Sequence, residues 1–599
     1  MNPVRILHLE SPNLDGQGDH VYRTLQPCRA LGTLPGISVL SGSLLSAEVH
    51  PLLETADLLV LCDVVDVDLI RVVEQRRARG LPTVYEINDH FRAPQTWNRT
   101  AYLADNLLTR SLSAQLAARA DLVQFTCPAL AEIFGGINPR HAVFGNHLWS
   151  LPAARDSRDT DIVWLGWGGS LGHLADLEWV MPVLRGLLAR HPHVRLAIMG
   201  PQNLGALFDW VPPERFRFRK GGNIAEYYAF VDTLDIGICP LLPTPFNRCR
   251  TDIKLLELSA HGVVPVCSDL DPYRAVVRPG ENGFLFTDLP ELENILERLV
   301  CEAALRQRVT AAARLLAQDR LEEKHVEDRA ACYRELLARA PNGSADPLWQ
   351  TARSGPYHGS RYRRLTGKVE RHLYQGLTLS QEGDIGAARR ELRAAQKLAP
   401  RFYLPHLIEG TTEPDPTRAL AACRRAVQLN PHSAAAALAA AGRWLDAGDI
   451  AAAREELLRA LALSPNLGAA QARLADLCER QGDTRGATEW LTQAFAANPY
   501  FLHPPLRLAL AALETKDATR ATTLAAAAAA RDPDHHLPHF LLGRAALLQD
   551  DPQGAIGHLE RALDGAPDPT PILAQLAKAH AQRGDLATAR ALLEKLRAA

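Results

Sequence analysis

A run of charged side chains between residues 247 and 261 has the clearest chemical use. Arg250, Lys254, Glu257 and His261 follow one another at i, i+4, i+7 and i+11, a spacing that places them along one helix face. Two cations near a helix N-terminus, where backbone N–H groups are unpaired, suit a diphosphate. A carboxylate one turn further accepts hydrogen bonds from a diol such as a ribose. An ordinary solvated helix face fits the same pattern, so both interpretations stay open.

Residues 231–286 predict the elements that hold this face. DIGICPL is a short apolar strand, and IKLLELSAH is a helix that Thr251 or Asp252 caps and Gly262 ends. VVPVC follows as a buried parallel strand. The helix therefore begins at the carboxyl end of a strand, where open α/β sheets bind their ligands.

This segment resembles the donor-binding segment of retaining GT-B glycosyltransferases of the group 1 family, which use nucleotide sugars. That family carries a Glu-x7-Glu motif followed by a G-x-P-V-V strand. Here Glu257, HGVVPVCSD and PGENGFLF match the second half, whereas Cys249 stands where the first Glu is expected. FNRCRTDIKLLE is similar to the pattern F-N-x-x-K/R-S/T-x-x-K-x-x-E of a bacterial subgroup, which adds Asn247 to the expected donor-binding residues.

The resemblance covers residues 4 to 340, roughly, and implies an α/β GT-B fold of two Rossmann-like domains that face a cleft. It also implies that a nucleotide-diphosphate sugar is the donor, that the anomeric configuration is retained, and that no metal or other cofactor is needed.

A glycine-rich loop follows the strand DIVWLGW. Gly168 and Gly169 are expected to bring backbone N–H groups to the diphosphate, and Ser170 to add a hydroxyl. GWGGSLGHLADL resembles the subgroup pattern G-W-x-G-x-x-x-H-x-x-D-L, so His173 and Asp176 match it, His173 as a donor ligand or as a structural residue. The same G-G-S-L-G fits the hydrolase motif G-x-S-x-G, which leaves a Ser170 hydrolase as an alternative.

The first domain offers two further groups of candidates. Gly16 and Gly18 lie in the loop after the strand VRILHL, where the backbone can approach the donor, although a plain turn fits equally. The strand TVYEI leads into Asn88, Asp89 and His90, and polar groups at a strand's carboxyl end are placed for acid–base chemistry. The family carries a His-Asp pair there, and Asn88-Asp89 stands at its place in this sequence. The resemblance therefore implies Asp89 as a catalytic residue, and His90 as a second one if it substitutes for the missing His. An Asx-type turn is the alternative.

Asp66 and Asp68, within DVVDVD, form the kind of pair that metal-dependent transferases of the GT-A architecture use. We favour a cap on the following helix instead, so no metal ligand is predicted.

Composition limits the class of protein. The chain has 599 residues, enough for several domains. Its 66 Lys and Arg nearly balance 68 Asp and Glu, which gives no indication of a nucleic-acid partner. Ten dispersed Cys without a C-x-x-C motif favour a reducing compartment. The N-terminus lacks a signal-peptide pattern, and no transmembrane run is present, so a cytoplasmic location is expected.

A repeat occupies the last part of the chain. Prolines at 400, 431, 465, 499, 533 and 567 are spaced by 31 and then four times by 34 residues, and turn pairs such as Gly448-Asp449 recur with them. The pattern matches tetratricopeptide repeats (TPR), about seven of them. The expected domains are 1–155 (acceptor side), 156–340 (donor side), a linker at 341–369, and an all-α TPR solenoid at 370–599.

These features predict a glycosyltransferase whose TPR groove binds a protein or peptide acceptor, for example a flagellin or other surface protein. Synthesis of polysaccharide or O-antigen, with the repeats as assembly scaffold, is the main alternative. A non-catalytic sugar-nucleotide-binding scaffold also stays open, because the first Glu of the motif and the first-domain His are absent.

Overall fold

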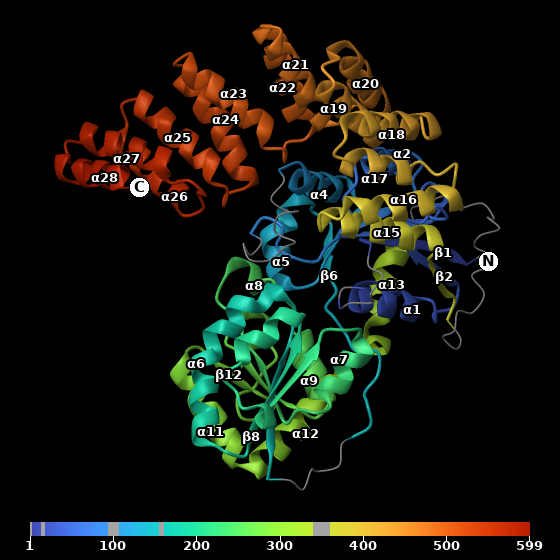
Figure 1. Ribbon diagram of the computed structural model, residues 1–599, viewed down its shortest axis with the longest axis vertical. Coiled ribbons are helices and arrows are strands. Elements are labelled where there is room, and N and C mark those ends of the chain that lie inside the picture. Colours follow the sequence, from blue (N-terminus) through green and yellow to red (C-terminus); the bar gives the residue numbers. More distant parts are fainter. Residues whose placement is uncertain are drawn as a thin grey trace. The chain divides into compact units, whose positions relative to one another are not determined.

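The computed structural model describes residues 3–12, 18, 20–93, 107–154, 161–338 and 360–598 (Figure 1). The chain forms two compact units. The first consists of Met1–Val64, Val72–Leu103 and Ala117–Tyr374, and the second of Val65–Arg71, Ala104–Leu116 and Gln375–Ala599. None of the described helices is both long and apolar enough to cross a membrane.

The first sheet of the first unit has seven parallel strands. Their order is β13 (Tyr362–Leu365), β2 (Ile37–Gly42), β1 (Val4–Glu10), β3 (Leu58–Cys62), β4 (Thr83–Ile87), β5 (Leu122–Phe125) and β6 (His141–Val143). The chain between these strands includes η1 (His20–Leu25), α1 (Gln26–Leu31), α2 (Asp68–Ala78), α4 (Leu107–Arg119) and α5 (Pro128–Phe134). The central strands are buried along almost their whole length because helices cover both faces of a parallel sheet.

The second sheet has six parallel strands, in the order β12 (Phe284–Phe286), β11 (Val264–Ser268), β10 (Ile236–Cys239), β7 (Val163–Gly168), β8 (Val194–Gly200) and β9 (Phe216–Lys220). Side chains of α6 (Leu174–Arg190) and α11 (Leu289–Cys301) pack on one face, and side chains of α7 (Ile224–Val231) and α9 (Ile253–Ala260) on the other. The strand order reverses between β7 and β10. Open α/β sheets bind ligands at such a switch point, at the carboxyl ends of the strands.

Two helices complete the first unit, α12 (Ala303–Asp319) and α13 (Glu322–Leu337). Val326, Ala330 and Tyr333 of α13 join the core under the first sheet, and the Tyr333 hydroxyl donates to Gln124 Oε1 at 2.8 Å. Helix α13 therefore returns the chain to the first sheet. The expected linker is partly wrong, because residues 362–365 within it form β13, whose backbone pairs with β2.

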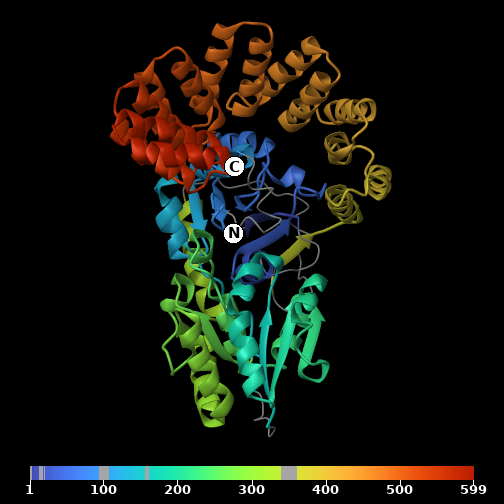
Figure 2. The same ribbon diagram turned by 60° about the vertical axis from the view of Figure 1, so that its left-hand side comes forward.

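The second unit contains fourteen helices in seven pairs within its described repeats, drawn in yellow to red in Figure 2. They are α15 (Lys368–Gln381), α16 (Ile385–Leu398), α17 (Leu404–Thr412), α18 (Pro416–Leu429), α19 (Ala434–Asp446), α20 (Ile450–Leu463), α21 (Gly468–Arg480), α22 (Thr484–Ala497), α23 (His503–Glu514), α24 (Ala518–Arg531), α25 (His536–Leu548), α26 (Pro552–Leu563), α27 (Thr570–Gln582) and α28 (Leu586–Ala598). The first half of α15, up to Tyr374, belongs to the first unit.

The turn pairs explain how each repeat reverses direction. Gly383, Gly448, Gly482 and Gly584 have positive φ, which ends the first helix of the pair. The Asp that follows then caps the second helix, as when Asp449 accepts a hydrogen bond from the Ala452 N–H at 2.9 Å. The predicted helix–turn–helix repeat is confirmed.

Candidate active site

Lys254 lies at the switch point of the second sheet. Its side chain is partly buried, and Nζ lies 5.2 Å from the centre of the Trp167 ring. Among the described residues no carboxylate forms an ion pair with Lys254, and burial lowers the pKa of the ammonium group. A desolvated cation of this kind favours an anionic ligand.

Gly169 leaves the space that Lys254 uses. A Cβ at this position would lie 2.6 Å from the Trp167 ring and 3.0 Å from Lys254 Nζ, so any side chain would displace one of them. A Cβ at Gly168 would lie 2.8 Å from Tyr227 Cε2. The Gly169 N–H does not point at a vacant site, because it donates to the Met199 carbonyl at 3.0 Å. In this structure Gly169 serves the site by packing rather than by its N–H group.

Asp176 connects two predicted donor-binding residues. Its carboxylate oxygens lie 2.9 Å from His173 Nδ1 and accept hydrogen bonds from Asn247 Nδ2 at 2.9 Å and from the Leu242 N–H at 2.8 Å. Burial, with the charge of Lys254, lowers the pKa of His173 to about 3, so the imidazole is neutral at pH 7. Asp176 and Asn247 thus hold α8 (Pro245–Arg248) against the start of α6, and His173 contacts the same carboxylate.

Ser170 does not have the surroundings of a hydrolase nucleophile. It is exposed at the N-cap of a short helical turn and makes no side-chain cap bond. No hydrogen bond joins its Oγ to an imidazole in the described part of the chain. The general base that a serine nucleophile needs is therefore not provided here.

Glu257 is buried and bonded to tyrosine. Tyr22, in η1 of the first domain, donates its hydroxyl proton to Glu257 Oε1 and lies 2.8 Å from the Tyr228 hydroxyl. Burial raises the pKa of Glu257 from 4.5 to about 7, a shift that the hydrogen bond from Tyr22 reduces. Sequence reasoning missed Tyr22, which no motif marks. Gly18, just before η1, is exposed, and Gly16 lies outside the described residues.

Arg250 precedes α9 rather than lying on it. The helix begins at Ile253, so Lys254 and Glu257 lie on it, while His261 is its C-cap and lies 2.7 Å from Asp232 Oδ1. The four-residue stripe predicted on one helix is therefore wrong at both ends. Arg250 Nη1 instead forms an ion pair with Asp89 Oδ1 at 2.6 Å.

His90 points into the first domain. It is 2% exposed, its ring lies edge-on to Phe134 at 5.2 Å, and Nδ1 accepts the Ala93 N–H at 3.1 Å. His90 is therefore part of a structural turn, as the alternative interpretation predicted. Asp89 remains the catalytic candidate at this strand end.

Cys249 occupies the place of the missing Glu. It is fully buried, its carbonyl accepts a hydrogen bond from Cys127 Sγ at 3.2 Å, and burial raises the pKa of its thiol to about 12. A neutral thiol does not supply the charge of a carboxylate.

Of the two aspartates considered as metal ligands, Asp66 makes the bond expected of a helix cap, whereas the Asp68 carboxylate bonds to Ser433 and Ala435. Asp66 Oδ1 accepts the Asp68 N–H at 2.7 Å at the start of α2.

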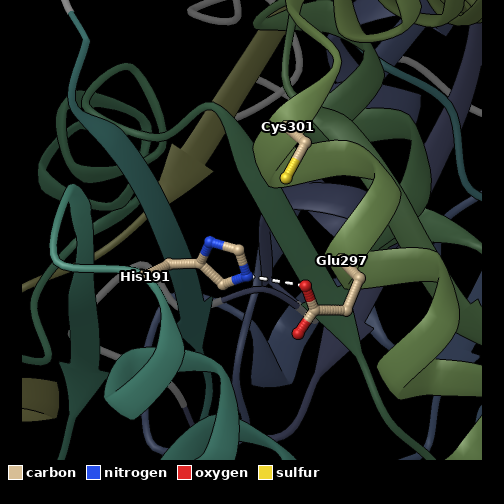
Figure 3. Close-up of side chains that lie close together, drawn as sticks. All are labelled: His191, Glu297 and Cys301. Carbon is tan, nitrogen blue, oxygen red and sulfur yellow. Dashed lines mark hydrogen bonds and ion pairs between the residues drawn. The ribbon is translucent and has the colours of Figure 1, made fainter.

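Another cluster, His191, Glu297 and Cys301, is drawn in Figure 3. His191 Nε2 lies 2.6 Å from Glu297 Oε2, and Cys301 follows one turn later on α11. Nitrogen, oxygen and sulfur ligands would suit Zn²⁺. However, Arg190 already pairs with Glu297 at 2.7 Å, and its charge opposes a cation. His191 precedes β8, and Glu297 and Cys301 lie at the end of α11, so the cluster is at the opposite end of the sheet from Lys254.

Comparison with known proteins identifies the segment that holds Lys254. Residues 163–302 match the family model of glycosyl transferases group 1. This segment is therefore similar to glycosyl transferases group 1. Residues 546–599 match a tetratricopeptide repeat model, so the last repeats of the chain are TPR repeats. No curated protein sequence matches the chain.

Several solved structures are similar to parts of the chain. HepE from Anabaena, in complex with UDP, is 15% identical and covers 56% of this chain and 100% of its own, with a TM-score of 0.40. Sucrose-phosphate synthase from Thermosynechococcus elongatus has the same identity and coverage and a TM-score of 0.42. YrrB, a TPR protein with an unusual peptide-binding site, is 18% identical over 32% of this chain and 97% of its own, with a TM-score of 0.25.

Proposed function

We propose that this protein is a glycosyltransferase that transfers a sugar from a nucleotide-diphosphate sugar to an acceptor. The observation that carries the proposal is Lys254, a desolvated cation without an ion-pair partner in the described chain, at the switch point of a group 1 glycosyltransferase segment. Such a cation stabilises the charge that develops on a leaving diphosphate.

The donor's parts fit the residues around Lys254. The diphosphate would lie against Lys254 and Arg250, with Gly169 keeping the approach open. The ribose diol would bond to Glu257, whose carboxyl group the Tyr22 hydroxyl holds in the present structure. Donor binding would then require exchange of the Tyr22 bond for a bond to ribose.

Asp89 is the acid–base candidate on the opposite strand end. Its ion pair with Arg250 holds the carboxylate beside the proposed diphosphate. We further propose that the configuration is retained and that the two cations replace a divalent metal. Retention rests on the family resemblance alone.

We propose a protein or peptide as the acceptor, because the TPR repeats add a surface that a small glycan acceptor does not need. A polysaccharide or O-antigen precursor is the second candidate, carried by the subgroup pattern from Asn247 to Glu257.

The test is calorimetric titration of the full chain with UDP-, GDP-, TDP- and CMP-sugars. A diphosphate sugar should bind best, because CMP-sugars carry a single phosphate. Lys254→Ala should weaken the binding of that donor by about 1.5–3 kcal/mol, the range of a charged hydrogen bond. The matched control is Lys324→Ala, which removes an exposed lysine whose Nζ lies 3.2 Å from Asp319 Oδ1 and should change nothing. Equal affinity in parent and Lys254→Ala would remove this donor site.

Turnover separates the transferase from a binding scaffold. Release of free sugar or its transfer from the bound donor supports the enzyme, whereas tight binding without any turnover supports the scaffold.

A further inference from the structure

The second unit contains two segments from the early part of the chain, Val65–Arg71 and Ala104–Leu116, in addition to the repeats. The described residues of these segments include the first turn of α2 and most of α4. These segments contact a polar position that recurs from one repeat to the next.

One position of the repeat is polar in four successive units. Asn430, Ser464, Asn498 and Asp532 are spaced by 34 residues, and each is the C-cap of the second helix of its pair. Ser464, Asn498 and Asp532 are buried, although a C-cap residue at a solenoid edge is normally hydrated. Their burial indicates that something covers this row.

Helix α4 covers the row at two of these positions. Asn498 Nδ2 donates to Gln115 Oε1 at 3.1 Å, and Gln115 Nε2 donates to the Asn466 carbonyl at 3.1 Å. Gln115 and Asn498 are each 1% exposed. Arg110 lies 3.8 Å from Asp532 Oδ2, one repeat further. One hydrogen bond joins the two amides, while Gln115 Nε2 donates to the backbone and Asn498 Oδ1 accepts the Tyr500 N–H. A mismatched side chain in this buried site would leave a polar group unpaired.

The start of α2 makes a second attachment. Asp68 Oδ2 accepts the Ser433 hydroxyl at 2.6 Å, and Asp68 Oδ1 accepts the Ala435 N–H at 3.1 Å. Val67 and Leu108 pack against the apolar cluster of α19 and α21. Polar and apolar contacts therefore act together at these repeats.

We propose that the repeats from α19 to α24 bind residues 65–71 and 107–116 of their own chain as a resident ligand. The specificity lies in the Gln115–Asn498 amide pair and in the Asp68 carboxylate at Ser433. A partner protein cannot use this row of C-caps while the segments are bound. This inference does not depend on transferase activity. Calorimetry at Lys254 tests the proposed function, and hydrogen exchange in α4 tests this inference.

The experiment is hydrogen exchange, by mass spectrometry, on the full chain. Asn498→Asp keeps the oxygen that accepts the Tyr500 N–H at 3.1 Å but removes the N–H donor and places a carboxylate against Gln115 Oε1. Amides of residues 107–116 should then exchange about tenfold faster, because one buried hydrogen bond is lost and a repulsion added. Exchange in α5 should not change.

The matched control is Asn430→Asp, two repeats earlier. Asn430 is also a C-cap, and its Oδ1 accepts the His432 N–H at 3.2 Å, but its described hydrogen bonds do not reach α4. This control should leave residues 107–116 unchanged.

A second variant keeps the test valid if Asn498→Asp unfolds the repeats. Gln115→Ala removes the other half of the pair within a helix that tolerates alanine. Faster exchange at residues 107–116 in Gln115→Ala, with α21 to α24 still protected, supports the proposal. Parental exchange at those residues in a folded Gln115→Ala protein would overturn it.

Discussion

Arg250 Nη1 and Asp89 Oδ1 form an ion pair of 2.6 Å between residues 161 positions apart in the chain. The pair joins the turn before α9 to the carboxyl end of β4, so a proposed phosphate ligand and a proposed acid–base group share one contact. A change at either residue will therefore affect the other.

Asp89→Asn should lower kcat about a hundredfold, the lower range for loss of a general acid or base, with donor affinity changed by less than about threefold. The asparagine amide is similar in shape but cannot take up a proton. Steady-state kinetics and calorimetry measure the two quantities. Asp271→Asn is the matched control, because Asp271 pairs with Arg248 at 2.6 Å on the surface. An unchanged kcat in Asp89→Asn would show that Asp89 only orients Arg250.

Gly169→Ala should reduce donor affinity at least tenfold and also destabilise the protein. The new Cβ would lie within 3.0 Å of the Trp167 ring and of Lys254 Nζ, and Trp167 is fully buried and cannot yield. Gly136→Ala is the control, since a Cβ there meets no atom within 4 Å. Parental affinity and melting temperature in Gly169→Ala would show that the loop can move aside.

Local patterns account for what the sequence could predict. Apolar runs between turn signals identified β7, β10 and β11, and the 34-residue spacing identified the paired helices and the turns between them. Lys254 and Glu257 were placed correctly on α9 because they lie inside one helix.

Long-range pairing accounts for what was missed. Tyr22 bonds to Glu257 across 235 residues of sequence, and β13 joins β2 from within the expected linker. Arg250 was included in the helix face because it lies four residues before Lys254, although the helix itself begins only at Ile253. Asn498 looked like an ordinary helix end, because its partner lies on a distant helix.

Transferase activity should be complete in EDTA, because Lys254 and Arg250 supply the positive charge that Mg²⁺ would otherwise bring to the leaving diphosphate. The measurement is initial rate of sugar transfer with and without chelator, and then with added Mn²⁺. Loss of activity in EDTA with recovery in Mn²⁺ would contradict this prediction and require a metal site among the acidic residues.

The Glu257 carboxyl group should make stability fall as pH rises. Burial raises its pKa in the folded state from 4.5 to about 7, so its contribution is complete below pH 4.5 and is lost as pH rises through about 7. This difference between the folded and unfolded pKa values corresponds to about 3 kcal/mol in the free energy of unfolding. Glu257→Gln imitates the protonated form, so this variant should match the parent at pH 4.5 and exceed it in stability above pH 7.

Denaturant unfolding at several pH values, as the difference between parent and variant, measures this effect. The control is Glu281→Gln, whose exposed carboxylate lies 3.3 Å from Arg278. A difference between parent and Glu257→Gln that does not vary with pH would show that Glu257 is ionised in the folded protein.

In two of the repeat turns a residue other than glycine adopts a left-handed backbone conformation. Lys516 and Asp550 have φ of 60° and 59°, at the positions where Gly448, Gly482 and Gly584 stand in other repeats. A side chain costs about 1 kcal/mol or more in this left-handed region, less for Asp than for Lys. Lys516→Gly should therefore raise the thermal midpoint of the repeats, and Asp550→Gly should raise it by a smaller amount. The reverse change, Gly482→Ala, should lower the stability of the repeats by a similar free energy.

Gly557→Ala is the control for Gly482→Ala and should raise the stability instead. Gly557 lies inside α26 with no atom within 4 Å of a new Cβ, and alanine is the better helix former there. A lower midpoint in Lys516→Gly would show that the lysine side chain makes a contact worth more than the backbone strain.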